Sequence, residues 1–588
     1  MTIPRSSLTI SLAALPCLAA TMLVSAPLTA QKTGGNWTTF HQWNGSSPGN
    51  SLGTAISPAG DVDGDGLADV LVGAPGASPG GLTGAGSAMI FSGASGALLF
   101  QVDGSAVGDA LGTSVASAGD LNGDGLAELI LGAPMASPLG LAEAGTVLVI
   151  DGATQAVLFQ FDGDNAGDHL GQSVAYLGDV NGDTTPDLLY GAPHHDPAGV
   201  NDAGSVWLRS GADGSIIHHF SGPAAGDWLG HCVSSALDLT ADGAADVLLG
   251  APGASPAGMA RAGSAYAYSS ADGSLLLQWH GSAAGDSLGF SVSGIGDSNN
   301  DGANDLLISA PNAVTGSVIP RISGEAYVMS GADGSTLRTK QGQDWFENYG
   351  WSVAAAGDVN FDGFADYMIG APLAQTGGVY HGSAYLIDGQ SGQTLQQADG
   401  SQNFEAMGSA VAGLGDINGV GTDLASGSGL LEVAFCAQGA APGGLANAGS
   451  VEVRGIAPLI SADSDEIITS TGGTIQFFVD FPAASAGHDF RLLGSQTGLG
   501  PIFNSGVYVP LTPGDQVWRY MTEPNAPAWF TNSIGVLDAN GDATVTMTVP
   551  VDEGAYFLGE TFYFAAVSYI PPSTPLMSSV AVKVDFLP

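Results

Sequence analysis

Short apolar runs separated by turns rich in Gly, Asp and Ser are the main pattern of this chain. The run VLVGAP follows Asp69, and GTVLVIDG from Gly145 is joined by a Gly-containing turn to AVLFQFDG from Ala156. Apolar runs of this length, bounded by turn residues, predict antiparallel β-strands joined by hairpins. Helical heptads are absent from the sequence, so we expect an all-β protein.

The strand pattern recurs in seven copies. Each copy has a Gly-led strand, an acidic loop, an apolar strand that ends in GAP or SAP in the first six copies, and two further strands. Internal repeats with four strands each predict a seven-bladed β-propeller. The acidic loops begin at Asp61, Asp120, Asp179, Asp238, Asp297, Asp358 and Asp416, and neighbouring copies are therefore 58 to 61 residues apart.

The two ends of the repeat array distinguish a closed ring from a linear solenoid. The seventh copy ends after GSVEVRG at Gly449 without a fourth strand, and WTTFHQWNG from Trp37 has the pattern of that missing strand. A strand at 37–45 would close a ring, whereas a solenoid needs capping repeats, and none is recognisable in the sequence. We expect a propeller over 31–456, closed by this N-terminal strand.

The Gly-led strand, the loop pattern D-x-[DN]-x-D-G-x-x-D and the GAP ending resemble the FG-GAP repeats of integrin α-subunit propellers and their bacterial relatives. The resemblance covers about 420 residues in seven copies. It implies the FG-GAP propeller fold. It implies less about function, because such propellers occur in adhesion proteins, in lectin-like modules and as appendages of enzymes.

The acidic loops offer oxygen atoms at alternate positions, as a hard cation such as Ca²⁺ requires. The expected ligands are the side chains of loop positions one, three, five and nine and the backbone carbonyl of position seven. Six intact loops would hold about six structural ions. The predicted sets are Asp61, Asp63, Asp65, Leu67 and Asp69; Asp120, Asn122, Asp124, Leu126 and Glu128; Asp179, Asn181, Asp183, Thr185 and Asp187; Asp238, Thr240, Asp242, Ala244 and Asp246; Asp297, Asn299, Asp301, Ala303 and Asp305; and Asp358, Asn360, Asp362, Phe364 and Asp366.

Two alternatives to this metal site can be weighed in the sequence. An EF-hand closes its loop with Glu at position twelve, where the first loop has Val72 and the other five have Leu, Tyr or Ile. Asx turns need no metal, but one Asp or Asn suffices for a turn, and each intact loop carries three or four carboxylates that repel one another without a cation.

Three loops depart from the pattern. Thr240 is a weaker donor than Asp or Asn, and Thr184 replaces the turn Gly of the third loop. The seventh loop, DINGVGTD from Asp416, has Val420 in place of the third acid and is one residue short, so we expect no ion there.

The charge of the chain restricts its partners. The formal net charge is −45, with 11 Lys and Arg against 56 Asp and Glu. No basic patch is available for a nucleic acid or an anionic membrane surface. Cations are therefore the expected charged partners.

The N-terminus and the cysteines indicate export. Arg5, an apolar stretch over 8–24 and a plausible cleavage site after Ala30 predict a secretory signal over 1–30. An uncleaved membrane anchor is the alternative, although Pro16 interrupts the stretch. We expect a secreted, extracellular or cell-surface protein in which Cys232 and Cys436 are small buried hydrophobes without a disulfide.

The repeat stops at about residue 457, and alternating strands such as TIQFFVDF and ETFYFAAVSYI follow. They predict a small β-sandwich over 457–588. Asp538, Asn540 and Asp542 echo the cation loop, but the Asn-Gly between them favours a hairpin turn. The oligomeric state is not predicted by any of these patterns.

Few other residues suggest chemistry. The pairs His194–His195 and His218–His219 are expected to be ordinary loop and strand residues. A transition-metal site is the alternative, but it needs converging ligands, and adjacent strand residues point to opposite sides. Trp345 and Phe346 belong to loops opposite the acidic loops, where a ligand is expected to bind; packing between blades is the alternative for Trp345.

The sequence contains no G-x-S-x-G, H-E-x-x-H or P-loop motif and nominates no catalytic residue. We therefore expect not an enzyme but a calcium-binding adhesion or ligand-binding module for an extracellular protein or glycan. A polysaccharide-acting hydrolase or lyase and a structural surface-layer component are the alternatives.

Overall fold

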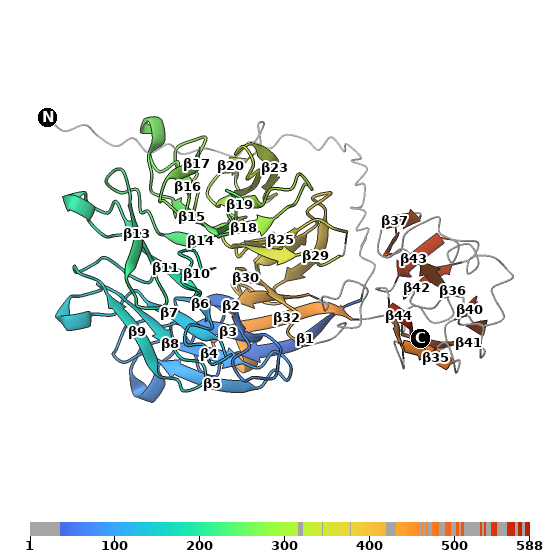
Figure 1. Ribbon diagram of the computed structural model, residues 1–588. Helices are drawn as coiled ribbons and strands as arrows, with labels where there is room; N and C mark the ends of the chain where they lie inside the picture. Colours follow the sequence, from blue (N-terminus) through green and yellow to red (C-terminus); the bar gives the residue numbers. More distant parts are fainter. Residues whose placement is uncertain are drawn as a thin grey trace, which may run out of the picture.

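The computed structural model describes residues 36–457 except 316–320, 344, 361, 377 and 419–430, and the backbone of strands within 460–587. The described part contains β-strands and short 3₁₀ turns but no α-helix. Figure 1 shows the strands of the repeats arranged as blades of a ring. The predicted seven-bladed β-propeller is confirmed.

Each blade is a four-stranded antiparallel sheet. The first strands are β2 (Ala55–Gly60), β6 (Ser114–Gly119), β10 (Ser173–Gly178), β14 (Cys232–Leu237), β18 (Val292–Gly296), β24 (Val353–Gly357) and β30 (Met407–Gly415). The second strands are β3 (Asp69–Ala74), β7 (Glu128–Ala133), β11 (Asp187–Ala192), β15 (Asp246–Ala251), β19 (Asp305–Ala310), β25 (Asp366–Ala371) and β31 (Glu432–Ala437). The third strands are β4 (Ser87–Phe91), β8 (Thr146–Ile150), β12 (Ser205–Arg209), β16 (Ser264–Tyr268), β22 (Glu325–Met329), β28 (Ser383–Ile387) and β32 (Ser450–Ala457). The fourth strands are β5 (Leu98–Asp103), β9 (Val157–Asp162), β13 (Ile216–Ser221), β17 (Leu275–His280), β23 (Thr336–Gln341), β29 (Thr394–Asp399) and, for blade 7, β1 (Asn36–Asn44).

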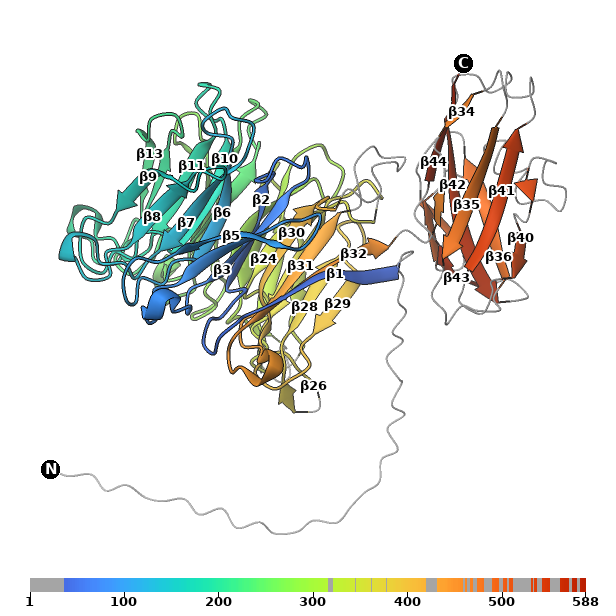
Figure 2. The same cartoon turned by 90° about the horizontal axis from the view of Figure 1, so that it is seen from below.

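Blade 7 is built from both ends of the repeat array. β1 pairs antiparallel with β32, so that Trp43 lies opposite Val451. Figures 1 and 2 show blue β1 beside orange β32. The N-terminal strand thus occupies the place of the missing fourth strand.

The core lies between neighbouring blades. Every residue of the second strands is buried, because each of these strands is covered on both faces by adjacent sheets. Seven apolar clusters link successive blades around the ring. One of them joins Trp43 of β1 to Val72 of blade 1 and Cys436 of blade 7, and so extends the core across the closure.

The antiparallel order of each blade separates its connections onto two faces. Connections from first to second strand and from third to fourth strand lie on one face, which we call the acidic face. Connections from second to third strand and between blades lie on the other, the variable-loop face. The latter carries η1 (Pro79–Gly81), η2 (Pro138–Gly140), η3 (Pro197–Gly199), η4 (Pro256–Gly258) and η5 (Pro442–Gly444), and in blades 5 and 6 the hairpins β20 (Val314–Thr315) with β21 (Arg321–Ile322) and β26 (Gln375–Thr376) with β27 (Val379–Tyr380).

The C-terminal region forms sheets of its own. Its strands are β33 (Ile460–Ala462), β34 (Glu466–Ile468), β35 (Gly473–Asp480), β36 (Asp489–Ser495), β37 (Pro501–Asn504), β38 (Val507–Pro510), β39 (Phe530–Thr531), β40 (Ile534–Val536), β41 (Asp542–Val549), β42 (Thr561–Ile570), β43 (Thr574–Ser578) and β44 (Val582–Leu587). The sheet orders are β33-β35-β41-β39 and β34-β44-β42-β36-β40, with β43 paired to β42 and a separate hairpin of β37 and β38. Two such sheets in an all-β region are consistent with the expected β-sandwich.

Candidate metal centre

The acidic loops join the first and second strands of the blades, and a bulge introduces each of them. The pairing register shifts by one residue just before each loop. In blade 1 the residue before Asp61 is Gly60, whose φ of 80° suits glycine. In blade 4 the same place is taken by Leu237 with a φ of 57°. The bulge turns the chain so that loop position one lies at the rim of the blade.

The carboxylate at position one organises the loop backbone. In the first loop Asp61 accepts hydrogen bonds from the backbone N–H of Gly64 at 2.7 Å and of Gly66 at 2.9 Å. In the third loop Thr184, with a φ of 73°, takes the place of the second glycine and donates to Asp179 at 2.7 Å. The Thr184 replacement therefore keeps the loop geometry.

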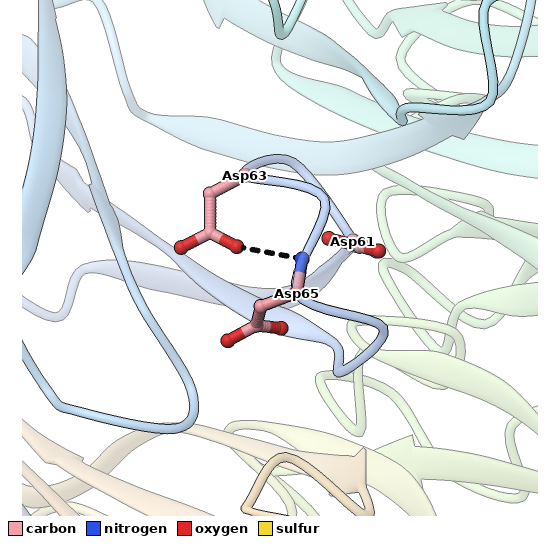
Figure 3. Close-up of side chains that lie close together, drawn as sticks. All are labelled: Asp61, Asp63 and Asp65. Atoms are coloured by element: carbon pink, nitrogen blue, oxygen red, sulfur yellow. Dashed lines mark hydrogen bonds between the residues drawn. The ribbon is translucent and has the colours of Figure 1, made fainter.

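Positions three and five also accept backbone hydrogen bonds. The N–H of Asp65 donates to Asp63 Oδ1 at 3.1 Å, and the N–H of Leu67 donates to Asp65 Oδ1 at 2.9 Å. These are Asx-turn bonds, so the turn chemistry considered as an alternative is present in the loop. These bonds do not explain why three carboxylates lie so close together: carboxylate oxygens of Asp61, Asp63 and Asp65 lie within 4.8 Å of one another. Figure 3 shows the three side chains on this loop.

The residue at position nine is the first residue of the second strand, and its side chain is buried in all six loops. Asp69 Oδ2 accepts the N–H of Val62 at 2.9 Å, and Oδ1 accepts the N–H of Gly93 at 3.1 Å. Gly93 lies in the turn between the third and fourth strands. This carboxylate therefore ties the acidic loop to the neighbouring turn on the same face.

Burial makes the charged form of the position-nine carboxyl costly. It raises the pKa of Asp69 and of Asp187 to about 6, although backbone hydrogen bonds oppose the rise. It raises the pKa of Asp366 well above its usual range. A bound cation would offset this cost, because an opposite charge nearby favours the ionised form.

Blade 2 adds a carboxylate that the sequence analysis missed. Oxygens of Asp124, Glu128 and Asp151 lie within 4.8 Å of one another, and Asn122 Nδ2 donates to both Glu128 and Asp151. Asp151 comes from the turn after the third strand, where four other blades carry Ser92, Ser210, Ser269 and Ser330.

Blade 6 repeats the hydrogen bond between the loop Asn and the turn Asp. Asn360 Nδ2 donates to Asp388 Oδ2 at 3.2 Å, and Asp388 occupies the place of Asp151. In blade 3, Ser210 instead donates to Asp183 at 3.0 Å. The turn residue therefore contacts the acidic loop in all three blades, and the Asp-for-Ser change in the repeat was the signal that could have revealed the two extra acids.

The seventh loop differs from its sequence-based interpretation. The second strand of blade 7 begins at Glu432, and the N–H of Ile417 donates to Glu432 Oε2 at 3.1 Å, as Val62 does to Asp69 in blade 1. Position nine is therefore filled by Glu432, and the loop from Asp416 is longer than the others rather than one residue short. The short count was wrong because it ended the loop at the next acid in the sequence. Val420 lies outside the described residues.

The side chains of His218 and His219 lie on opposite sides of β13. His218 Nε2 lies 2.9 Å from the carbonyl oxygen of Ser270 in blade 4, whereas the ring of His219 stacks on Trp207 with centroids 4.9 Å apart. The adjacent pair thus points to opposite sides, as expected. His195 also meets Trp207, at 5.4 Å.

Cys436 is buried, Cys232 is half-buried, and both are free thiols. The predicted signal over 1–30 and the turn holding Asp538 and Asn540 lie outside the described residues. Within the described ranges, no helix has the length and apolar character needed to span a membrane.

A comparison with known protein families identifies four of the repeats. The FG-GAP repeat family matches residues 52–91, 111–150, 171–208 and 349–386. These segments lie in blades 1, 2, 3 and 6, and each extends from the end of the preceding connection through the acidic loop into the third strand.

Similar proteins include integrin alpha-4 of Xenopus laevis, 32% identical over 166 residues, which are 26% of this chain and 15% of the relative. Integrin alpha-V of Gallus gallus is 30% identical over 214 residues, 34% of this chain and 20% of the relative. Phosphatidylinositol-glycan-specific phospholipase D of Bos taurus is 34% identical over 199 residues, 29% of this chain and 23% of the relative. The chain thus spans less than a quarter of the length of each of these three proteins. Together with the seven-bladed fold, these matches show that this chain contains an FG-GAP-repeat β-propeller that is similar to integrin α chains.

Proposed function

We propose that this chain is a secreted or cell-surface adhesion or ligand-binding module whose six intact acidic loops bind Ca²⁺. The observation that carries the binding function is the contrast between the two faces of the propeller. The acidic face is organised by carboxylates and backbone hydrogen bonds, whereas the variable-loop face exposes the aromatic side chains of Trp345, Phe346 and Phe404. The similarity to integrin α chains supports the same division of roles.

Three exposed aromatic residues lie on the connections that follow blades 5 and 6. Trp345 is 43% exposed, Phe346 50% and Phe404 64%. The ring of Phe404 stacks on Tyr380 with centroids 6.1 Å apart, so it is held in place at the surface. Exposed aromatic side chains on preformed loops are typical of protein-binding surfaces. The partner is an extracellular protein or glycan.

The donor set of the acidic loops fits calcium. Carboxylate and amide oxygens at positions one, three, five and nine, together with the carbonyl of position seven, are hard ligands of the kind that Ca²⁺ takes. Ca²⁺ would supply positive charge that offsets the repulsion among the carboxylates. Its role is structural, because position nine connects the loop to the turn of the third and fourth strands. We propose no catalytic residue.

An array of extracellular matrix proteins and glycans, probed with the full chain in Ca²⁺ and in EGTA, tests this function. We expect binding in Ca²⁺ that is weakened by Trp345→Ala and Phe346→Ala. The control is Leu139→Ala, which removes an apolar side chain that is 96% exposed on the same face in blade 2. Binding that survives all three substitutions, or no binding at all, would contradict the proposal.

A further inference from the structure

A cleft opens between blades 2 and 3, with a volume of about 220 Å³. Its walls come from the fourth strand of blade 2, the second and third strands of blade 3, and the loops that follow β9 and β11 on the variable-loop face. The side chains that define its chemistry are Phe161, Asp162, Asp164, His195, Trp207 and Arg209.

The other blades provide internal controls for this cleft. At the position of His195 the other six blades carry only alanine: Ala77, Ala136, Ala254, Ala313, Ala374 and Ala440. Trp207 has Met89 and Leu148 as its equivalents in blades 1 and 2, and His219 has Gln101 and Gln160. Blades 4, 5 and 6 have the smaller aromatic residues Tyr266, Tyr327 and Tyr385 at the place of Trp207. Packing between blades therefore requires neither a tryptophan nor the two histidines that blade 3 has at these places.

Trp207 is held in a fixed orientation by its neighbours. His219 stacks on it at 4.9 Å, His195 meets it edge-on at 5.4 Å, and the Tyr190 ring lies 5.9 Å away. His195 is itself fixed, because its Nδ1 lies 2.8 Å from Ser205 Oγ. Trp207 is only half-buried, and the part of its ring that these neighbours leave open lines the cleft in a fixed orientation.

Arg209 is held in the same way. Its guanidinium lies 4.6 Å from the centre of the Phe161 ring, and Nη1 donates to the carbonyl oxygen of Gly214 at 2.8 Å. The guanidinium is thus a positioned donor rather than a mobile surface charge.

The cleft offers both donors and acceptors to a ligand. Asp162 and Asp164 are exposed carboxylates, and Asp162 already accepts a hydrogen bond from Thr146 at 2.9 Å. Arg209 offers N–H groups, and His195 offers its second ring nitrogen. A hydroxyl group both donates and accepts, so a ligand rich in hydroxyls matches this mixture. Its C–H faces can pack on Trp207.

The charge of the cleft selects among such ligands. Asp162, Asp164 and Asp168 outnumber the one arginine, and burial lowers the pKa of His219, which keeps that ring neutral near pH 7. An anionic ligand would be repelled. A metal ion is also disfavoured, because the histidines form no group of three ligating atoms among the described residues.

We propose that the cleft between blades 2 and 3 binds a neutral saccharide unit, with the open part of the Trp207 ring as the apolar contact and Arg209, Asp162 and His195 as hydrogen-bond partners. This inference goes beyond the proposed function: it names one site and one ligand class, and it would hold even if blades 5 and 6 bound nothing.

The test is a titration of the full chain in Ca²⁺ with methyl glycosides of glucose, galactose, mannose and N-acetylglucosamine. Tryptophan fluorescence and calorimetry measure the binding. Glucuronate is the anionic comparison. We expect at least one neutral glycoside to bind with a millimolar or lower dissociation constant, and glucuronate to bind at least tenfold more weakly.

The variants replace blade-3 residues with those of other blades. They are His195→Ala, Trp207→Leu and Arg209→Ile. Other blades have these residues at the same places, so we expect the variants to fold. We expect each to weaken binding at least fivefold at an unchanged melting temperature. The control is Tyr385→Leu, at the place of Trp207 in the cleft of blades 5 and 6, with less than a twofold effect.

The proposal is overturned if no neutral glycoside binds at 50 mM (roughly fifty times a millimolar constant), if glucuronate binds best, or if Trp207→Leu and His195→Ala both bind as the unchanged chain does. Loss of binding in Tyr385→Leu alone would also overturn it. Should Trp207→Leu fail to fold, His195→Ala decides, since alanine fills that position in the six other blades. These outcomes do not depend on the matrix-protein array, so the two proposals fail separately.

Discussion

At the scale of single residues, seven copies of one unit show which side chains the fold needs. His231 directly precedes β14, the first strand of blade 4, and its ring lies beside that of Phe290 with centroids 4.8 Å apart. Blade 3 has Gln172 at the same place. The fold therefore does not require an imidazole there. Replacing His231 can thus reveal how burial affects the pKa of its ring.

Burial lowers the pKa of His231 to about 4, against 6.5 for the free side chain. The unfolded chain thus binds a proton between pH 6.5 and pH 4 that the folded protein does not bind, and the stability contribution of the neutral ring is lost as the pH falls through this window. The ring is partly exposed, so we expect a loss of roughly 1 to 2 kcal/mol between pH 7 and pH 5 relative to His231→Gln. Urea unfolding of both proteins at the two pH values measures it. Equal slopes with pH in the two proteins would show that the ring titrates normally.

Asp151 gives a second prediction at this scale. Asp151→Ser restores the residue of four other blades and removes one carboxylate from the blade 2 site, so we expect the Ca²⁺ affinity of that site to fall about tenfold, which corresponds to about 1.4 kcal/mol. Calorimetric titration with Ca²⁺ measures the change. Ser92→Asp in blade 1 is the reciprocal control and should not weaken binding. An unchanged titration of Asp151→Ser would mean that Asp151 takes no part in cation binding.

At the scale of elements, β1 closes the ring. Trp43 is buried, stacks on Phe91 of blade 1 at 4.4 Å and donates from Nε1 to the carbonyl oxygen of Gly96 at 2.8 Å. Its strand pairs with β32 of blade 7. One side chain therefore links the first and last blades.

Trp43→Ala should destabilise the propeller by about 3 to 5 kcal/mol, because it removes a large buried side chain and leaves a cavity at the closure. Chemical denaturation in saturating Ca²⁺ measures the loss. Trp345→Ala, at an exposed position, serves as the control and should change stability by less than about 0.5 kcal/mol. Similar losses for the two variants would argue against a special role of the closure.

Most of the elements could be predicted from the sequence, because each blade repeats its own turn residues and apolar strands. The acidic loops could be predicted for the same reason: Asp61 to Asp69 are contiguous, and their spacing repeats. Asp151 could not be assigned, because it reaches the loop from a different turn of the folded blade. Glu432 was missed because a long insertion separates it from Asp416. The cleft at Trp207 depends on side chains that meet only across two blades.

At the scale of the whole molecule, the chain combines a high negative charge with a closed ring of blades. The formal net charge is −45, and a compact state of that charge is destabilised by self-repulsion. Six cation loops on one face would reduce this repulsion and connect the two turns of each blade. The opposite face then remains available for ligands.

Thermal unfolding in EGTA and in Ca²⁺ tests this claim most directly. With dissociation constants on the order of 10⁻⁴ M, 10 mM Ca²⁺ stabilises the folded state by about 2.7 kcal/mol for each occupied site. We predict a melting temperature at least several degrees lower in EGTA than in Ca²⁺, restored by adding excess Ca²⁺ but not by the same concentration of Na⁺. A melting temperature that is the same in EGTA and in 10 mM Ca²⁺ would contradict calcium binding by these loops.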